Sequence, residues 1–429
     1  MLVTVIGDRI HDLELPPERR AEGGSGWVRR LRHLFALHDR DRNVEVVDAT
    51  EPGNTAHKLR ERWTDDVLLS KSGIVLVNAG MSDALGFCAK NDPYAKDAAG
   101  AVSILDELFA RCKARSPTTR LIAIEPVLNS IDTSPLRSGP VAKALTAYSA
   151  AIRELTDRNG IPFLPAGDLI RAAKRVRNDD EWLGCDPAGL DTCGSMLMAD
   201  AAFRMIAGLT TPAPTALEHG QTLLLIGDSI TDAGRRGTGY PYGTGYVRLF
   251  QGLQAAREPS KIVRIINKGI GGDTIVDIES RWERDVTPYR PDWLVLYTGI
   301  NDMNTIYGRP VKITPDVYRE GLNRCIASVR RDLPNVRCLL VAPFMLTRDD
   351  HSESYRCEML RRMTDYTHAV ESVANAQGTR FLDLQAVMRP LMDRYGNRAL
   401  GSNLGVDNIH PGELGCLAIA ESMYCAFAA

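Results

Sequence analysis

Short apolar runs alternate with amphipathic stretches along the second half of the chain. Five strands are predicted from the apolar runs, at residues 223–226, 262–266, 293–297, 338–342 and 381–384. Residues 247–253 and 275–286 carry apolar side chains three or four positions apart, which is the spacing of a helix with one buried face. A last helix is predicted to start at Pro411, because proline suits the first turn of a helix. Strands that alternate with helices indicate an α/β fold whose parallel sheet is covered on both faces.

The first half of the chain repeats this pattern. Residues 55–67 align with 274–286 at an offset of 219 (274 − 55), and residues 74–80 align with 293–299 at the same offset. The offset drifts by only one or two residues over the whole of each half. A self-similarity of this kind indicates a tandem duplication of one fold.

The boundary between the copies is predicted in a stretch that holds two prolines, Pro212 and Pro214, and no periodicity. This composition is typical of a linker between domains. We therefore predict a first domain at residues 1–208, a linker at 209–220 and a second domain at 221–429.

Four short segments of the second half combine glycine with polar side chains, and each follows a predicted strand or precedes the last predicted helix. They are Gly227-Asp228-Ser229-Ile230-Thr231, Asn267-Lys268-Gly269-Ile270-Gly271-Gly272-Asp273-Thr274, Gly299-Ile300-Asn301-Asp302 and Asp407-Asn408-Ile409-His410-Pro411. Segments that follow parallel strands meet at one edge of the sheet, so we expect them to converge in space. A serine hydroxyl needs a base to become a nucleophile, and His410 could be that base if Asp407 holds its other nitrogen.

Together these segments resemble the signature blocks of the SGNH (GDSL-type) hydrolase family, and the likeness covers residues 221–429. The resemblance implies a sheet of order 2-1-3-4-5, and thus two tandem flavodoxin-like (SGNH-type) doubly wound parallel-sheet domains. It also implies an ester hydrolase with Ser229 as nucleophile, His410 as base and Asp407 as the acid that orients it. The oxyanion hole would consist of the backbone N–H groups of Ser229 and Gly272 and the side-chain amide of Asn301. No cofactor and no metal is expected.

Two of these residues also have a purely structural interpretation. Gly272 lies beside Gly271, and it could serve only to make a tight turn. Asn301 could cap the helix that follows it, which is a frequent function of asparagine. We regard Asp302 as the better cap candidate, which leaves Asn301 for the oxyanion hole.

The first half differs from the second at the positions where chemistry would occur. The aligned pairs are Arg9 for Ser229, Gly53 for Gly272, Ser82 for Asn301, Asp186 for Asp407 and Gly189 for His410. A guanidinium cannot supply a hydroxyl, and glycine cannot accept a proton. We therefore expect a degenerate, catalytically inactive domain in which none of these five residues has a catalytic role, and in which Arg9 pairs with Asp8 or Asp186.

The substrate is suggested by a polar, tyrosine-rich loop after Ser229, which contains Tyr240, Tyr242 and Tyr246, and by Tyr307 further along. With Arg-Trp-x-x-Asp-Val at 281–286, this loop looks like the acetylxylan-esterase branch of the family. That likeness implies removal of acetyl groups from acetylated xylo-oligosaccharides or related saccharides. The tyrosines suit stacking on sugar rings, or else they only pack the loop and core. A short-chain lipase, lysophospholipase or thioesterase of the same fold, and a non-catalytic sugar-binding protein, are the alternatives.

Composition and charge argue against several other partners. The formal net charge of −2 gives no indication of nucleic-acid or membrane binding. The nine cysteines include no C-x-x-C pair, which argues against a disulfide framework and against a zinc site. Residues 1–8 run directly into a predicted strand without a signal-peptide pattern, so we expect a cytoplasmic protein. The two halves should pack as an intramolecular pseudo-dimer, and the chain could also form a homo-oligomer.

Overall fold

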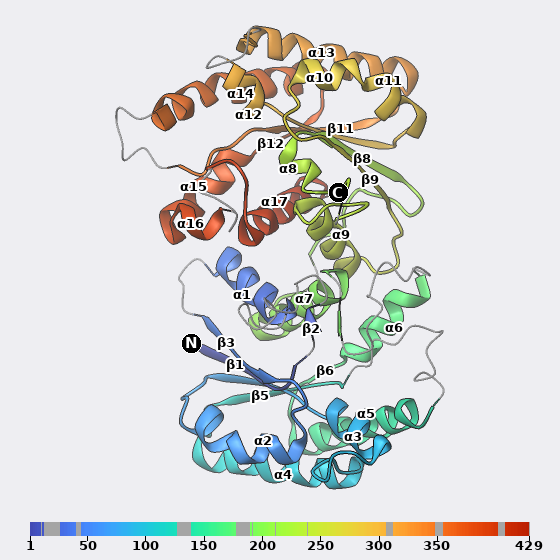
Figure 1. Cartoon of the computed structure of the whole chain (residues 1–429), viewed down its shortest axis with the longest axis vertical. Coiled ribbons are helices and arrows are strands. Elements are labelled where there is room, and N and C mark those ends of the chain that lie inside the picture. The colour runs from blue at the N-terminus through green and yellow to red at the C-terminus, as the bar shows by residue number, and fades with distance from the viewer. Residues whose placement is uncertain are drawn as a thin grey trace. The chain divides into compact units, whose positions relative to one another are not determined.

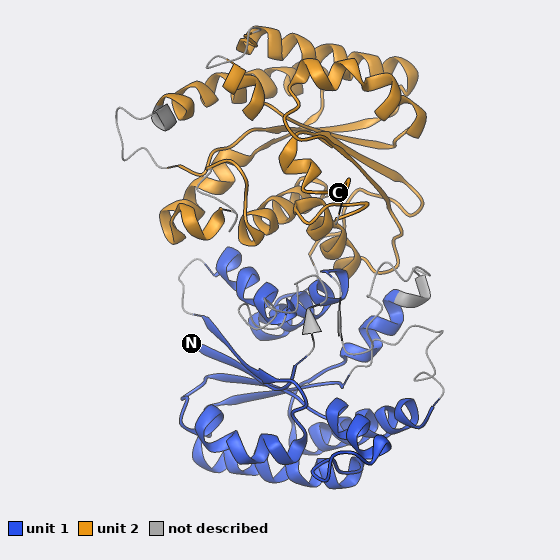
Figure 2. Cartoon of the chain, in the orientation of Figure 1, with its two compact units in different colours: residues 1–211 blue, residues 212–429 orange. Residues whose placement is uncertain are grey.

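The computed structural model of the chain divides into two compact units, Met1–Thr211 and Pro212–Ala429 (Figure 2). It describes residues 1–9, 11–12, 26–39, 44–126, 139–176, 189–190, 192–210, 212–237, 239–305, 312–347, 355–401 and 408–428. Each unit contains a five-stranded sheet whose strands all pair in parallel, with helices on both faces (Figure 1). The prediction of two tandem doubly wound α/β domains is therefore confirmed.

The sheet of the second unit has the predicted strand order. Its strands are β8 (Thr222–Gly227), β9 (Arg264–Gly269), β10 (Trp293–Tyr297), β11 (Arg337–Ala342) and β12 (Arg380–Asp383). They lie in the order β12-β11-β10-β8-β9, which is 2-1-3-4-5 when it is counted from the β9 edge. All five residues of β10 and all but the first of β8 are buried, because helices cover the centre of the sheet on both sides.

Two layers of helices enclose this sheet. On one face, α10 (Ile275–Ser280), α11 (Trp282–Asp285), α13 (Pro315–Asp332) and α14 (Tyr355–Gln377) share one apolar core with β8, β10 and β11. On the other face, α9 (Tyr246–Arg257) packs against α17 (Glu413–Ala426) (Figure 1). The remaining helices of the unit are α8 (Ser229–Asp232), α12 (Ile300–Asn304), α15 (Leu384–Tyr395), α16 (Asn397–Leu400) and a 3₁₀ turn at Thr287–Tyr289.

Two predicted helix boundaries in this unit are wrong. The helix expected at 275–286 is broken at Arg281, whose φ of −109° and ψ of 9° lie outside the helical range. The last helix begins at Glu413 and not at Pro411. Pro411 instead forms an antiparallel bridge with Gly401, and Gly412 is the N-cap.

The first unit has the same topology. Its sheet follows the order β3-β1-β4-β5-β6, built from β1 (Leu2–Asp8), β3 (Glu45–Glu51), β4 (Ile74–Asn78), β5 (Arg120–Ile124) and β6 (Phe163–Leu164). Its helices are α1 (Gly26–His38), α2 (Ala56–Trp63), α3 (Met81–Ala89), α4 (Ala98–Arg115), α5 (Pro140–Asn159), α6 (Ala166–Val176), α7 (Thr192–Ala207) and a π-helical turn at Thr64–Leu68. A separate pair of short strands, β2 (His11–Asp12) and β7 (Gly189–Leu190), completes the unit.

The residues that follow Pro214 are built into the second unit. The Thr215 hydroxyl donates to the Glu258 carboxylate at 2.7 Å, and the Ala216 N–H donates to the Phe427 carbonyl at 2.6 Å. Leu217 is fully buried. In the parts of the chain that the structure describes, no helix is both long enough and apolar enough to cross a membrane.

Candidate active site

Ser229 is presented at the carboxyl edge of the sheet by a sharp turn between β8 and α8. Asp228 caps the short helix, since its carboxylate accepts the Ile230 N–H at 3.0 Å. A Cβ on Gly227 would lie 2.2 Å from the Tyr297 carbonyl oxygen, so only glycine allows the neighbouring strand to approach here. The turn leaves Ser229 half-buried as the first residue of α8.

His410 lies beside this serine. Its Nε2 is 2.8 Å from the Ser229 Oγ. The stretch before α17 that carries His410 is fixed at both ends: the Leu346 N–H donates to the Asn408 carbonyl and the Gly412 N–H donates to the Leu400 carbonyl, each at 2.7 Å. If Nε2 accepts the Ser229 proton, the ring must carry its own proton on Nδ1.

The loop after β9, residues 270–273, is called the glycine loop and passes directly beside Ser229. A Cβ on Gly271 would lie 3.8 Å from the Ser229 Cβ, and the Gly271 N–H donates to the Asp232 carboxylate at 3.1 Å. Gly272 has a φ of +86°, in the left-handed region, although a Cβ there would meet no atom within 4 Å. Glycine is therefore required at 272 for its backbone conformation and not for space.

Asn301 reaches the same loop from α12. Its Nδ2 donates one hydrogen to the Asp273 carbonyl at 3.1 Å, and the amide has a second hydrogen to give. The N-cap of α12 is Gly299, so Asn301 does not cap the helix. Asp302 does not cap α12 either, contrary to our expectation, because its carboxylate accepts the Ile275 N–H of α10 at 2.8 Å.

Two buried carboxyl groups lie behind these residues. Asp228 and Asp302 are both fully buried, and burial raises the pKa of each to about 7. Hydrogen bonds from the Ile230 and Ile275 N–H groups offset this effect only in part. Near neutral pH each group is therefore partly protonated, which limits the negative charge close to the proposed oxyanion hole.

Two residues that hold the site together, Asp232 and Arg281, are not among the site residues predicted from the sequence. Asp232 binds the glycine loop, as described above, and Arg281 donates to the Asp273 carboxylate at 2.7 Å. A signal for Arg281 was present in the chain, because its pairing with Asp285 four residues later recurs as Arg62 and Asp66 in the first half. Asp232 recurs as well, as Asp12, at the offset of 220 that relates Arg9 to Ser229.

Asp407 and Asp186 lie outside the described residues, so their predicted roles stay predictions. Tyr307 also lies outside them. Among the residues that are described, no group of three or more His, Cys, Asp or Glu side chains is arranged to hold a metal ion.

The corresponding place in the first unit has a different chemistry. The Arg9 guanidinium donates to the Thr50 carbonyl at 2.7 Å and to the Thr50 hydroxyl at 3.3 Å. The expected pair with Asp8 is therefore wrong, because the Asp8 carboxylate accepts the Ser82 N–H at 2.8 Å instead.

Two glycines occupy the other aligned positions of the first unit. Gly53 has a φ of +71° and keeps the left-handed conformation of Gly272. Gly189 pairs with His11 in the small β2–β7 sheet and has no side chain to act as a base.

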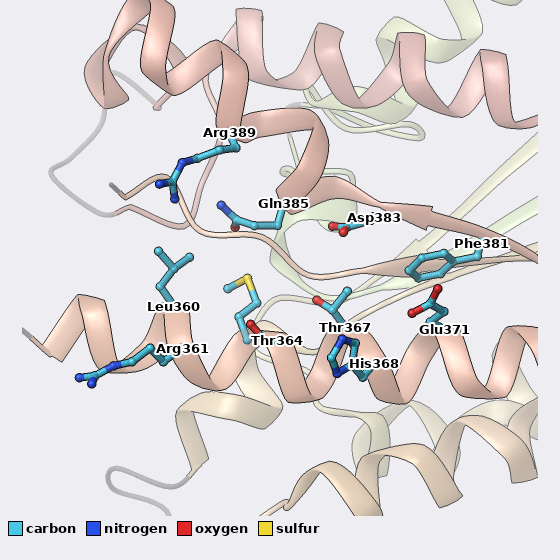
Figure 3. Close-up of a pocket in the computed structure, with 11 residues that line it drawn as sticks. Leu360, Arg361, Thr364, Thr367, His368, Glu371, Phe381, Asp383, Gln385 and Arg389 are labelled. Carbon is cyan, nitrogen blue, oxygen red and sulfur yellow. The ribbon is translucent and has the colours of Figure 1, made fainter. Parts of the chain in front are cut away.

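A hollow of about 490 Å³ lies between α14 and α15 of the second unit. Figure 3 shows Gln385 and Arg389 of α15 across from Leu360 and Arg361 of α14. None of the predicted site residues lines it. Its α14 side is exposed at Arg361, Thr364, His368 and Glu371, so the hollow is an open groove separate from Ser229.

Comparison with known proteins gives matches for both halves of the chain. The model of the GDSL-like lipase/acylhydrolase family matches residues 5–186 and 225–416. An acetylxylan esterase from Geobacillus stearothermophilus is 33% identical over 210 residues, which cover 47% of this chain and 92% of the relative. A crystal structure of an acetylxylan esterase from the same organism matches with 30% identity and a TM-score of 0.43, covering 49% of this chain and 96% of that one. An α/β hydrolase from the metagenome of Lake Arreo matches with 29% identity and a TM-score of 0.44, covering 49% and 96%.

Proposed function

We propose that this chain, which belongs to the GDSL-like lipase/acylhydrolase family, removes acetyl groups from carbohydrate esters through Ser229 of its second unit. Family membership and the similarity to an acetylxylan esterase make it a carboxylic ester hydrolase. The observation that carries the proposal is the 2.8 Å contact between the His410 Nε2 and the Ser229 Oγ. This distance lies within the range over which a general base takes a proton from a nucleophile.

The first half-reaction forms an acetyl-enzyme. His410 Nε2 takes the hydroxyl proton of Ser229 while Oγ attacks the ester carbonyl carbon. The carbonyl oxygen becomes an oxyanion and accepts hydrogen bonds from the N–H groups of Ser229 and Gly272 and from the free amide hydrogen of Asn301. When the tetrahedral intermediate collapses, the bond to the sugar oxygen breaks, and His410 returns the proton to that oxygen.

The second half-reaction hydrolyses the acetyl-enzyme. His410 takes a proton from water as the water oxygen attacks the acetyl carbon, and the same donors stabilise the second oxyanion. Ser229 Oγ then leaves, recovers the proton from His410, and acetate is released. In this scheme Asp407 accepts the Nδ1–H of His410 and stabilises the imidazolium.

Support for a saccharide substrate comes from the relative and from the loop beside α8. The Asn267 side chain donates both to the Thr231 carbonyl of α8, at 2.6 Å, and to the Tyr242 carbonyl, at 2.8 Å, and so ties the tyrosine loop to the helix that begins at Ser229. Tyr240 of this loop is 79% exposed and can stack on a sugar ring. Tyr246 is fully buried and serves the core instead.

The first unit is proposed to be inactive by this mechanism. Arg9 supplies no hydroxyl at the nucleophile position, and its guanidinium is bound to Thr50. Gly189 supplies no base at the position of His410. The two copies should therefore contribute a single active serine to each chain.

Two assays on the purified chain test the proposed substrate. Acetylated xylo-oligosaccharides should lose acetyl groups, which mass spectrometry detects. Ser229→Ala should lower kcat for this reaction by about four orders of magnitude or more. On p-nitrophenyl esters from acetate to decanoate, acetate should react fastest, and EDTA should have no effect because no step uses a metal. Faster turnover of octanoate than acetate, at equal concentration below KM, would favour the lipase or thioesterase alternatives.

A further inference from the structure

Arg281 is a buried cation that binds four acceptors at once. The side chain is only 7% exposed. Its Nε donates to the Asp273 carboxylate at 2.7 Å, and its Nη1 donates to the Lys268 carbonyl at 2.9 Å and to the Asp285 carboxylate at 3.0 Å. Its Nη2 donates to the Gly227 carbonyl at 3.2 Å. Only the fork of a guanidinium can serve acceptors in so many directions.

These acceptors lie next to the backbone donors of the proposed oxyanion hole. Gly227 ends β8, two residues before Ser229, and Asp273 directly follows Gly272. One guanidinium thus joins the end of the strand that carries the nucleophile to the loop that carries the second donor. The relative position of the two N–H groups depends on this connection.

The glycine loop needs such support because of its own composition. Two consecutive glycines have more conformational freedom than any other pair, so the loop does not hold a single shape by itself. It is held at Gly271 by Asp232, while Asp273 is bound through its carbonyl by Asn301 and through its carboxylate by Arg281. An oxyanion hole lowers a barrier only when its donors are fixed before the reaction.

The negative charge of Asp285 persists to low pH. Burial by itself would raise the pKa of Asp285, but hydrogen bonds from Arg284 and Arg281 hold it at about 2. Asp285 therefore stays ionised and keeps the guanidinium in place. Burial raises the pKa of Asp273 despite its contact with Arg281, so Asp285 is the partner that stays charged at low pH.

The first unit separates the structural contacts of this arginine from the functional ones. Arg62, aligned with Arg281, keeps the aspartate four residues later, Asp66, at 2.5 Å, and the Ala49 carbonyl of β3 at 2.6 Å. It also pairs with the Glu51 carboxylate at the end of β3, at 3.2 Å. It makes no hydrogen bond to Asn54, which stands in the place of Asp273, or to the Gly7 carbonyl. All of these residues belong to the described part of the chain. The hydrogen bonds to the Asp273 carboxylate and to the Gly227 carbonyl therefore have counterparts only in the unit that has Ser229 and His410.

The backbone is also altered to make these contacts. Arg62 lies within α2, whereas Arg281 interrupts the helix between α10 and α11. In the first unit the helix leaves the α-helical form two residues later, at the π-helical turn Thr64–Leu68. The first unit therefore shows that the fold does not require the helix to break at this arginine.

We propose that Arg281 is a positioning residue for the oxyanion hole, which fixes the Gly272 N–H relative to Ser229 through Asp273 and the Gly227 carbonyl. This inference rests on the proposed function. Arg281 does not touch the substrate; it acts through the backbone that it holds. Its loss should therefore weaken stabilisation of the transition state more than binding of the ester.

The test compares Arg281→Lys with Arg62→Lys, the matched change in the first unit, on p-nitrophenyl acetate. A lysine keeps the charge but cannot reach four acceptors. We expect kcat to fall roughly 10- to 100-fold in Arg281→Lys, with KM within about threefold of the wild-type value, because a displaced donor costs catalysis on this order. Arg62→Lys should leave both constants unchanged.

A second readout is the affinity for an alkylboronic acid, which forms a tetrahedral adduct with an active serine and so probes the oxyanion hole directly. Its affinity should fall in parallel with kcat in Arg281→Lys, while the pH profile of kcat/KM keeps its shape. Asp273→Asn should lower kcat and boronate affinity in the same direction but by less. If Arg281→Lys does not fold, this variant provides the test of the positioning role. Added guanidinium should partly restore Arg281→Ala.

The inference and the proposed function fail in different ways. If wild-type enzyme and Ser229→Ala turn over acetate esters equally, the proposed function is wrong. If Ser229→Ala is inactive but Arg281→Lys and Asp273→Asn keep wild-type kcat and boronate affinity, only the role of Arg281 is wrong. A kcat loss fully matched by a loss of folded protein would contradict the positioning role as well.

Discussion

The imidazole Nε2 of His410 lies 2.8 Å from the hydroxyl oxygen of Ser229, although 181 residues separate the two in sequence. Ser229 begins α8 at the end of the first strand of its sheet, and His410 lies three residues before α17. The two side chains meet because α17 packs against α9, the helix that follows the tyrosine loop. The proposed chemistry therefore depends on the packing of the last helix of the chain.

A buried ion pair holds these two helices together and provides the first prediction. The guanidinium of Arg257 on α9 binds both carboxylate oxygens of Glu421 on α17, at 2.8 and 2.5 Å, with both side chains buried. Glu421→Ala removes this carboxylate from the buried arginine, which should reduce the free energy of unfolding by about 3–5 kcal/mol.

Chemical denaturation of the second unit measures this change. The matched control is Glu279→Ala, which removes the partner of the more exposed Arg324 and should cost about 1 kcal/mol or less. Equal effects of the two substitutions would contradict the account.

The second prediction concerns the amide of Asn301. Asn301→Ala removes one donor of the proposed oxyanion hole and should lower kcat about 100- to 1000-fold with little change in KM. Asn301→Asp should be at least as harmful, since it replaces a donor by a negative charge. Ser82→Ala, at the aligned position of the first unit, is the control and should have wild-type kinetics. Wild-type kcat in Asn301→Ala would remove this residue from the site.

The third prediction follows from the raised pKa of Asp302, which is about 7 in the folded protein against an ordinary value of 3.8. Between these two pH values the folded chain binds more protons than the unfolded chain, so this carboxyl makes the protein less stable as pH rises. Asp302→Asn cannot titrate, while its amide can still accept the Ile275 N–H. The stability advantage of wild type over this variant should therefore shrink as pH rises from about 4 to about 7.

Calorimetric unfolding of both proteins across that pH range is the measurement. Asp316→Asn, at a carboxylate that is 73% exposed on α13, serves as the control. An advantage of wild type that grows with pH would mean that Asp302 is not a carboxyl with a raised pKa.

The fold could be predicted from the sequence because its signals are periodic and occur twice. The apolar run at 223–226 lies within β8, and that at 293–297 coincides with β10. Parallel strands place their carboxyl ends at one edge, so motifs that follow strands had to converge there. The repeat adds a second, independent instance of each pattern, such as Trp63 and Trp282, which are both buried in the cores of their units.

The partners of individual polar side chains could not be predicted in the same way. Periodicity shows which face of a segment is buried, but not which acceptor a long side chain reaches. Arg9 binds Thr50 and not Asp8, and Arg281 leaves its helix to bind the glycine loop. Asp302 accepts the first N–H of α10, at Ile275, and does not cap its own helix. Each of these contacts joins segments distant in sequence, and each depends on strand positions that only the folded chain defines.

We propose that each chain has one reactive serine, Ser229, although it carries two copies of the fold. Labelling the full chain with a serine-directed phosphonate, followed by mass spectrometry of the intact protein, tests this proposal. We predict one phosphonate adduct per chain, which peptide mapping locates on Ser229 and which is absent in Ser229→Ala and strongly slowed in His410→Ala. Two adducts per chain, or a single adduct on any other serine, would contradict the account.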